Sequence, residues 1–102
     1  MIRVIATIQL QAGRREEFLR IFKAIVPTVL REKGCREYGP MIDLETTIGA
    51  QIPLRPDVVT IVEGWADLDS LENHLIAPHM IEYRKAVKEL VASVSLQVLE
   101  PA

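Results

Sequence analysis

The chain has 102 residues, of which 49% are hydrophobic and 25% are charged, and its formal net charge at pH 7 is −2. These values are typical of one soluble domain, so we predict a single domain over residues 1–102 and a cytoplasmic protein. The sequence has no dense lysine–arginine cluster and no RNA-binding aromatic motif, which excludes the common nucleic-acid-binding modules. Residues 1–10 are too short and too polar on one side for a membrane span or a signal peptide, and the single cysteine excludes an internal disulfide.

Alternation between apolar and polar residues predicts a first strand over residues 2–10. Apolar residues at helical spacing then predict a helix over residues 14–33, ended by Gly34, whose apolar side packs on the sheet. A second strand is predicted from residue 35 to about residue 45. Within it, Pro40 indicates an edge strand or a bulge, because proline cannot donate a ladder hydrogen bond.

The segment 46–56 is a long connection for so small a domain. Because Ile48, Ile52 and Leu54 make it too apolar for a free loop, we expect it to border the site or a dimer interface. The third strand is predicted over residues 57–66, and both of its faces are apolar. The helices of the chain can cover one face, and we expect a second subunit to cover the other, which predicts a homodimer.

The second half of the chain contains two helical patterns and a last strand. Asp67 can cap the first helix, and Pro78 interrupts it and begins a second helix over residues 79–91. The last strand is predicted over residues 93–99. The order β-α-β-β-α-β is typical of a ferredoxin-like α+β fold, with a four-stranded antiparallel sheet and helices on one face.

One strand-to-helix stretch contains the only tryptophan and both histidines, so we expect a site there first. His74 is a candidate catalytic base because an unperturbed imidazole titrates at about 6.5; the alternative is a half-buried histidine bonded to helix carbonyls. Trp65 is a candidate to stack on an aromatic substrate, or else a large core residue. Glu63 lies on the same side of the strand and contacts substrate or pairs with an arginine such as Arg84 or Arg36; we favour the pairing.

Three further residues are candidates for substrate binding. Tyr38 and Tyr83 can hydrogen-bond a substrate, although buried tyrosines are more often core residues with a wet hydroxyl. His79 can line the rim of a pocket or face solvent at the start of a helix. A metal site formed by His74 and His79 is not expected, because their spacing straddles Pro78 and no third ligand is evident in the sequence.

Three segments carry a resemblance to a known family: AGRREEFLRIF, VPTVLREKGCREY and VEGWADLDSLENHLIAPHM. They cover most of the chain, which resembles the antibiotic biosynthesis monooxygenase family, including its quinol monooxygenases. The resemblance implies a dimeric α/β barrel that oxidises a small aromatic or quinol compound with O2 and without a cofactor, and it adds weight to His74 as the base. The sequence contains no G-x-G-x-x-G, G-x-x-x-x-G-K or H-E-x-x-H motif, which is compatible with this implication. Related barrels that degrade haem use an asparagine on the first strand; Thr7 stands near that position here, so haem degradation is not expected.

Two other functions stay open on the sequence. The first is another enzyme on the same barrel, such as an isomerase of a small phosphorylated or keto-sugar signal, which a polar and charged pocket would favour. The second is a non-enzymatic small-molecule-binding or stress-response protein, which a pocket filled by side chains would favour. An apolar cavity near Trp65 and His74 would instead favour the monooxygenase.

Overall fold

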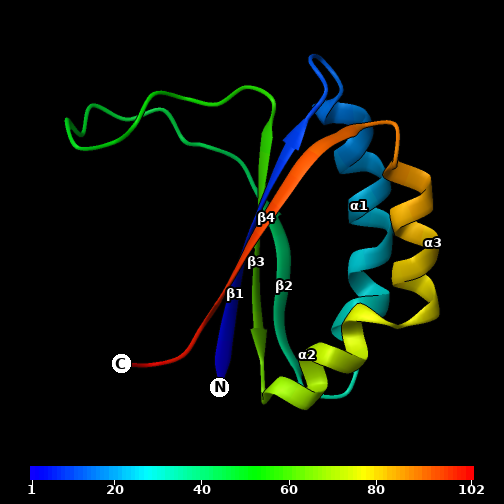
Figure 1. Ribbon diagram of the computed structural model, residues 1–102. Helices are drawn as coiled ribbons and strands as arrows, with labels where there is room; N and C mark the ends of the chain where they lie inside the picture. The colour runs from blue at the N-terminus through cyan, green and yellow to red at the C-terminus, as the bar shows by residue number, and fades with distance from the viewer.

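A four-stranded antiparallel sheet with three helices on one face forms the protein (Figure 1). The computed structural model describes residues 1–102. In chain order the elements are β1 (Ile2–Leu10), α1 (Arg15–Leu30), β2 (Cys35–Met41), β3 (Val58–Trp65), α2 (Leu68–Leu75), α3 (Pro78–Val87) and β4 (Val91–Leu99). The strands lie in the order β2-β3-β1-β4, and each neighbouring pair is antiparallel. The predicted ferredoxin-like α+β architecture is therefore confirmed.

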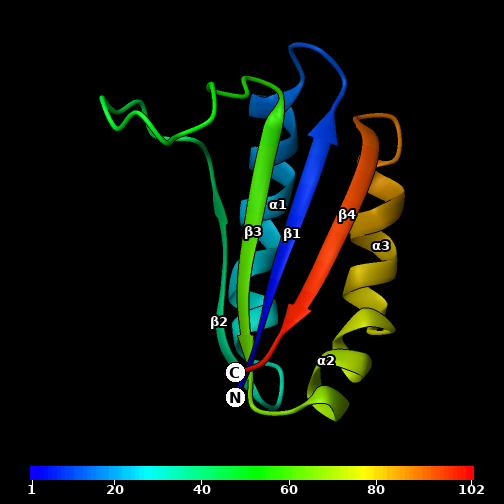
Figure 2. The same ribbon diagram turned by 60° about the vertical axis from the view of Figure 1, so that its left-hand side comes forward.

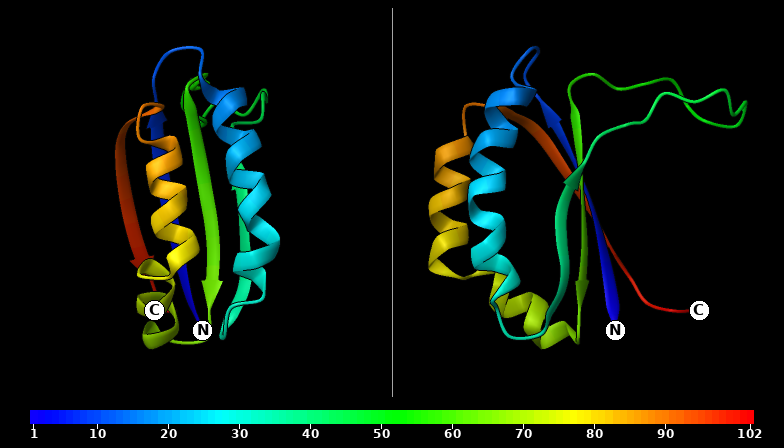
Figure 3. Two further views of the ribbon diagram at one scale, coloured as in Figure 1. Left: turned by 90° about the vertical axis from the view of Figure 1, so that its right-hand side faces the viewer. Right: turned by 180° about the vertical axis from the view of Figure 1, so that it is seen from behind.

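The register of the sheet separates two different faces. Val4 lies opposite Glu63 and Ala6 lies opposite Ile61, so these residues share the face that α1 and α3 cover. From Val4 onward, the alternate residues of β1 that point to this face are all buried: Val4, Ala6, Ile8 and Leu10. The other face carries residues that are only half-buried: Ile5, Thr7, Thr60 and Val62. No helix of the chain lies over this second face. Figure 2 shows it with the helices behind the strands, and the right panel of Figure 3 shows all helices on the other side. We refer to it as the bare face.

Helix α1 supplies the aromatic part of the core. Phe18, Phe22 and Val29 are buried against the sheet, and acidic residues occupy the first helical turn, where the helix dipole favours them. The helix ends at Leu30 rather than at the predicted residue 33. The cause is a turn that continues to Gly34, which has a φ of +83° and lies against α2. A Cβ atom at Gly34 would collide with the hydroxyl of Ser70, so only glycine fits this close approach.

Identifiable residues fix where helices α2 and α3 begin and where α3 ends. Asp67 caps α2 by accepting a hydrogen bond from the Ser70 N–H at 2.8 Å, and Pro78 occupies the first turn of α3. Helix α3 ends at Val87, not at residue 91, because the Leu90 N–H bonds the Val87 carbonyl at 2.8 Å and closes a turn. Strand β4 consequently begins earlier than predicted. None of the helices is both long enough and apolar enough to cross a membrane.

Residues 42–57 form an extended arm between β2 and β3, because β2 ends at Met41 rather than at about residue 45. The arm projects from the sheet on the side opposite the helices (Figures 1 and 3). At its base, Arg55 donates three hydrogen bonds to the Asp43 carboxylate, two from its guanidinium at 2.9 and 2.8 Å and one from its backbone N–H at 3.0 Å. These bonds lower the pKa of the Asp43 carboxyl to about 2, so the ion pair persists at neutral pH. Large apolar side chains along the arm are exposed: Ile42, Leu44, Ile48, Ile52 and Leu54.

Candidate active site

An apolar cavity of about 410 Å³ lies between the covered face of the sheet and the helices. Eleven of its fifteen lining residues are hydrophobic, and they come from all four strands and all three helices. Its mouth opens beside β4, where the lining side chains are exposed: Leu75, Arg84, Lys88, Val94 and Leu96. The cavity is of a size that a small aromatic molecule can fill. None of the arm residues lines it.

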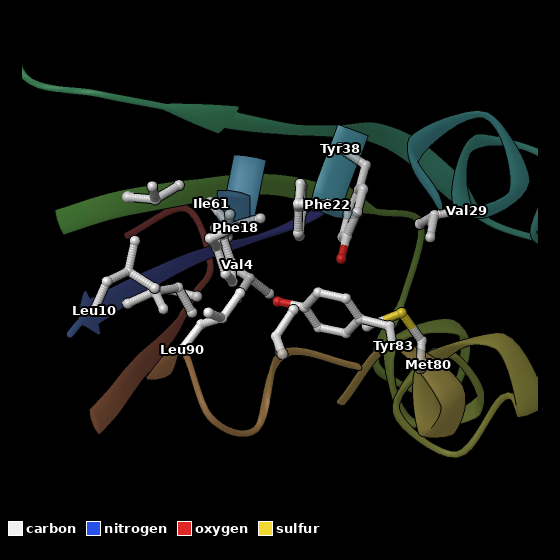
Figure 4. Close-up of a cluster of buried hydrophobic side chains, with 14 of the residues drawn as sticks. Val4, Leu10, Phe18, Phe22, Val29, Tyr38, Ile61, Met80, Tyr83 and Leu90 are labelled. Carbon is white, nitrogen blue, oxygen red and sulfur yellow. The ribbon is translucent and has the colours of Figure 1, made fainter. Parts of the chain in front are cut away.

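Aromatic side chains form one wall of the cavity. The ring of Phe22 stacks on Tyr38 at 5.4 Å, and Tyr83 meets Phe22 edge-on at 5.6 Å. Figure 4 shows Phe22 and Tyr38 side by side, with the ring of Tyr83 across from them. Burial, with the charge of Glu63 as the next cause, raises the pKa of the Tyr38 phenol far above its ordinary value, and burial does the same for the pKa of Tyr83. Both phenols therefore stay protonated at neutral pH and can act as hydrogen-bond donors.

The two phenolic hydroxyls are free to bond a ligand. Neither the Tyr38 nor the Tyr83 hydroxyl hydrogen-bonds another group of the chain. Because every fully buried side-chain nitrogen and oxygen has a partner, these two hydroxyls are not fully buried, and both residues line the cavity. The hydroxyls consequently open onto the cavity. Both residues were predicted as substrate-binding candidates, and the structure places both of them on the cavity wall.

His74 is the one imidazole that lines the cavity. Its side chain is packed between Trp65, with ring centroids 4.7 Å apart, and Tyr38, at 5.3 Å. The residue is 1% exposed, so it is a core residue, more deeply buried than the half-buried histidine of the alternative interpretation. Burial lowers the pKa of His74, while the neighbouring Glu32 carboxylate partly opposes this, so the ring is neutral at neutral pH.

Hydrogen bonding fixes which nitrogen of His74 faces the cavity. Nδ1 lies 2.9 Å from the Oε2 atom of Glu32, and because a carboxylate only accepts, Nδ1 carries the proton. Nε2 has no hydrogen-bond partner within the chain and carries the lone pair. A neutral imidazole held in this tautomer, with its basic nitrogen open to an apolar cavity, is the arrangement of a general base.

Glu32 is the functional candidate that sequence reasoning missed. It follows α1, and its Oε2 atom lies 2.9 Å from His74 Nδ1 and 2.6 Å from His79 Nε2. The expectation that no third ligand-type residue accompanies the two histidines is therefore wrong. Glu32 is separated from them by 42 and 47 residues and lies in a charged segment that reads as a solvated helix end, so no local pattern marks it. Only the turn at Gly34, which brings this segment against α2, could have suggested the contact.

The geometry of this cluster is that of a carboxylate shared by two imidazoles. Glu32, His74 and His79 offer atoms of types that bind divalent cations, all within 4.8 Å of one another. Two atoms bound to one zinc ion at about 2.0–2.2 Å in tetrahedral geometry lie roughly 3.3–3.6 Å apart. The separations of 2.6 and 2.9 Å are shorter and are those of hydrogen bonds.

Glu63 and Trp65 form a second buried polar pair. The indole N–H of Trp65 donates to Glu63 Oε1 at 2.9 Å, and burial raises the pKa of the Glu63 carboxyl. The predicted pairing of Glu63 with Arg84 or Arg36 is wrong. Side chains two residues apart on a strand share a face, so the indole reaches the carboxylate first, while Arg84 donates to the Leu75 carbonyl at 2.6 Å.

Trp65 and His79 do not line the cavity, whereas Glu63 does. Trp65 is fully buried behind His74, which agrees with its alternative interpretation as a core residue. His79 lies in the first turn of α3 with 28% of its side chain exposed, and it borders a shallow groove between α1 and α3 on the outside of the molecule. It reaches the site only through Glu32.

Residues 1–86 match the family model of antibiotic biosynthesis monooxygenases. The chain is 40% identical over 103 residues to "Probable quinol monooxygenase YgiN" of Escherichia coli strain K12, a match that covers 99% of this chain and 98% of that protein. A solved structure of a conserved protein from Methanosarcina mazei Go1 superimposes with a TM-score of 0.83 at 26% identity, covering 99% of this chain and 92% of that one. PA3566 from Pseudomonas aeruginosa gives a TM-score of 0.81 at 24% identity, covering 99% and 93%. The matched sequence spans both the Glu32 turn and the β3–α2 unit that carries His74, and the chain belongs to the antibiotic biosynthesis monooxygenase family.

Proposed function

We propose that the protein is a cofactor-independent monooxygenase that oxidises a small aromatic or quinol compound with O2. The observation that carries this proposal is the neutral His74 ring, whose Nε2 atom faces an apolar cavity while Glu32 holds its Nδ1 proton. Membership of the family and the similarity to YgiN support the same class of reaction. For a hydroquinone, the balanced reaction is hydroquinone plus O2 to hydroxyquinone plus water.

The first step is removal of a phenolic proton. His74 Nε2 accepts the proton, and the O–H electron pair stays on the substrate as a phenolate. The Glu32 carboxylate stabilises the imidazolium that forms, as the acid of a His–Asp couple does in hydrolases. The phenolate is electron-rich enough to pass electrons to O2, so the substrate itself supplies the reducing power.

The cavity walls support that step in two ways. Tyr38 and Tyr83 stay protonated, so their hydroxyls can donate hydrogen bonds to the phenolate or to a reduced oxygen species. The hydrophobic lining excludes water from the reactive intermediate, which limits its hydrolysis and side reactions. The cavity that His74 lines is mainly apolar, which favours the monooxygenase over a sugar-phosphate isomerase, and it is open rather than filled by side chains.

A homodimer is part of the proposal. The bare face of the sheet presents Ile5 and Val62, and the arm adds five exposed large apolar side chains on the same side. Large apolar side chains exposed together on one side of a protein are typical of an interface. We infer that a second copy packs on the bare face and under the arm, and that the arm borders the dimer interface. An obligate interface of this type buries more than about 2,000 Å² in total.

Isotope labelling tests the proposed reaction. The purified protein is mixed with 1,4-naphthohydroquinone under ¹⁸O2, with a protein-free sample to measure autoxidation. The expected product is a hydroxynaphthoquinone with one ¹⁸O atom, formed faster than without protein. Labelling no faster than in the protein-free sample, across one-ring and two-ring hydroquinones, would exclude the activity. Elemental analysis and an absorption spectrum of the same sample check the expected absence of metal, flavin and haem.

A further inference from the structure

We propose that His74, Glu32 and His79 form a proton relay that connects the cavity with the outer surface of the protein. The inference rests on the proposed function, because it concerns the proton that the base removes. It assigns roles to Glu32 and His79, which do not line the cavity. Glu32 and His79 are positioning and relay residues in this scheme, and His74 alone touches the substrate.

The three side chains form one continuous line of hydrogen bonds. His74 Nδ1 lies 2.9 Å from Glu32 Oε2, and the same oxygen lies 2.6 Å from His79 Nε2. The line crosses three separate elements: α2, the turn after α1, and the first turn of α3. Its exposure increases step by step, since His74 is buried, the Glu32 side chain is 15% exposed and the His79 side chain is 28% exposed. One end opens to the cavity and the other opens to solvent.

Packing alone does not account for this arrangement. A carboxylate removed from water costs free energy unless its oxygens are hydrogen-bonded, and apolar residues of the same volume would pack as well without that cost. A carboxylate can accept hydrogen bonds at both of its oxygens, so packing does not require two donors to meet at one of them. Here two imidazoles converge on a single oxygen, and the outer imidazole contributes nothing to the cavity wall.

No ion pair outside the relay includes one of its three side chains. The groups that face it from the neighbouring elements are Lys33, Cys35, Tyr38, Glu63, Asp69 and Arg84. None of their side chains hydrogen-bonds or forms a salt bridge with a relay side chain; the one hydrogen bond is from the Cys35 backbone N–H to the Glu32 carbonyl at 3.1 Å. Glu32 also borders a polar hollow between the α1 turn and α2, which is the competing exit for a proton.

The proton transfers balance without moving electrons. The phenolic O–H bond breaks and an Nε2–H bond forms on His74. The Nδ1–H bond of His74 then breaks as its proton passes to the Glu32 carboxylate. His79 donates its Nε2–H to that carboxylate and starts with a proton on each ring nitrogen, so it keeps the Nε2–H bond and releases its Nδ1 proton to water. When O2 is reduced and water forms, the same path runs in reverse. The relay therefore stores charge outside the cavity while the phenolate reacts.

Solvent exchange of the His74 Nδ1 proton, measured by NMR on the free protein, tests the relay without any substrate. In His79→Gln, the amide can still donate to Glu32 but cannot titrate. We expect the His74 Nδ1–H signal to keep its chemical shift while its exchange with water slows by about tenfold, a modest fraction of the 10²–10⁴ typical of acid–base groups. The matched control is Glu72→Gln, an exposed carboxylate on α2, which should leave the exchange rate unchanged.

Each outcome decides the relay. Unchanged exchange in His79→Gln would overturn it, because protons would then leave from Glu32 through the polar hollow. If His79→Gln does not fold, Glu32→Gln gives the same readout, since an amide there also interrupts the transfer. With quinol turnover established, His79→Ala should lose about tenfold in kcat and recover with added imidazole, a rescue expected of proton transfer and not of packing. A protein that shows slowed exchange but no quinol turnover would retain the relay and lose the proposed function.

Discussion

The two faces of the sheet differ in how far the rest of the same chain buries their side chains. On the covered face, apolar residues of β1 and β3 are buried, and the polar groups Glu32, Glu63 and His74 all have hydrogen-bond partners. Only β4, at the mouth of the cavity, leaves apolar side chains of this face exposed: Val94, Leu96 and Val98. On the bare face and the arm, large apolar residues stay exposed. Adjacent residues of β3 contribute to both, since Ile61 and Glu63 point one way and Thr60 and Val62 the other. The residues of the candidate site therefore all come from one chain, whereas the exposed apolar surface is where we propose that a second copy binds.

The largest effect is expected from a substitution in the cavity over the covered face. His74→Ala removes the base, so O2-dependent turnover of a hydroquinone should fall by about 10²–10⁴-fold in an oxygen-electrode assay. It also leaves the carboxylate of Glu32 without one of its donors, and this should lower the free energy of unfolding by about 1–3 kcal/mol in chemical denaturation. His79→Ala is the milder control. Normal turnover in His74→Ala would contradict the role of base, and a change in oligomeric state would contradict the separation of the two faces.

The next largest effect is expected from a substitution on the bare face. Val62→Glu places an unpaired carboxylate in the inferred interface, which should weaken dimerisation by about 10²-fold or more, because an unpaired buried charge costs several kcal/mol. Sedimentation velocity at micromolar concentration should show a dimer for the wild type and a monomer for the variant. A wild-type monomer at that concentration would sink the homodimer proposal. If the monomeric variant is folded yet inactive, the cavity depends on the partner, and the comparison between the faces fails.

A smaller effect sharpens the description of the cavity wall. Tyr83→Phe removes one hydroxyl donor and keeps the aromatic ring, so stability should hardly change. A neutral hydrogen bond contributes about 0.5–1.5 kcal/mol, which corresponds to roughly a two- to tenfold loss of kcat/KM. Tyr38→Phe is the companion variant from the opposite side of the cavity. Unchanged kcat/KM in both variants would show that neither hydroxyl contacts the substrate.

The smallest effect concerns Glu63, whose pKa burial raises in the folded protein. A carboxyl with a raised folded pKa stabilises the fold below its unfolded pKa of about 4.3, and that contribution is lost as pH rises through the folded pKa. Glu63→Gln keeps an oxygen for the Trp65 indole and removes the charge. It should therefore stabilise the protein by about 1 kcal/mol at pH 7 and by nothing near pH 4. Thermal melts at both pH values measure this; a variant less stable at pH 7 would show that the charge is favourable where it lies.

The fold was predictable because its signals are local. Alternation along β1 and the apolar stripe of α1 locate those elements, and Pro40 correctly indicates an edge strand, since β2 pairs only with β3. The errors occur where a distant contact ends an element. Helix α1 stops early because Gly34 packs on Ser70, and β2 stops early because the chain leaves the sheet for the arm that Asp43 and Arg55 close.

The site was predictable only in part. His74 follows from its place after β3 in a stretch with the only tryptophan, and Tyr38 and Tyr83 follow from their places on buried faces. Glu32 was not predictable, because its two partners lie more than forty residues away in the chain. The predicted arginine partner of Glu63 is wrong because the indole of Trp65, two residues away on the same face, lies within reach of the carboxylate.

Gly34 shows how a residue without a functional group can control the spacing of a site. It lies two positions after Glu32, and the Ser70 that it touches lies one helical turn before His74. The contact between Gly34 and Ser70 therefore acts as a spacer that sets how far the carboxylate stands from the imidazole. Any larger side chain at Gly34 would push α2 outward and lengthen that hydrogen bond. Even alanine at position 34 would shift α2 and so misalign His74 and Glu32. A mutational screen for activity should therefore find Gly34 as sensitive as the residues that line the cavity.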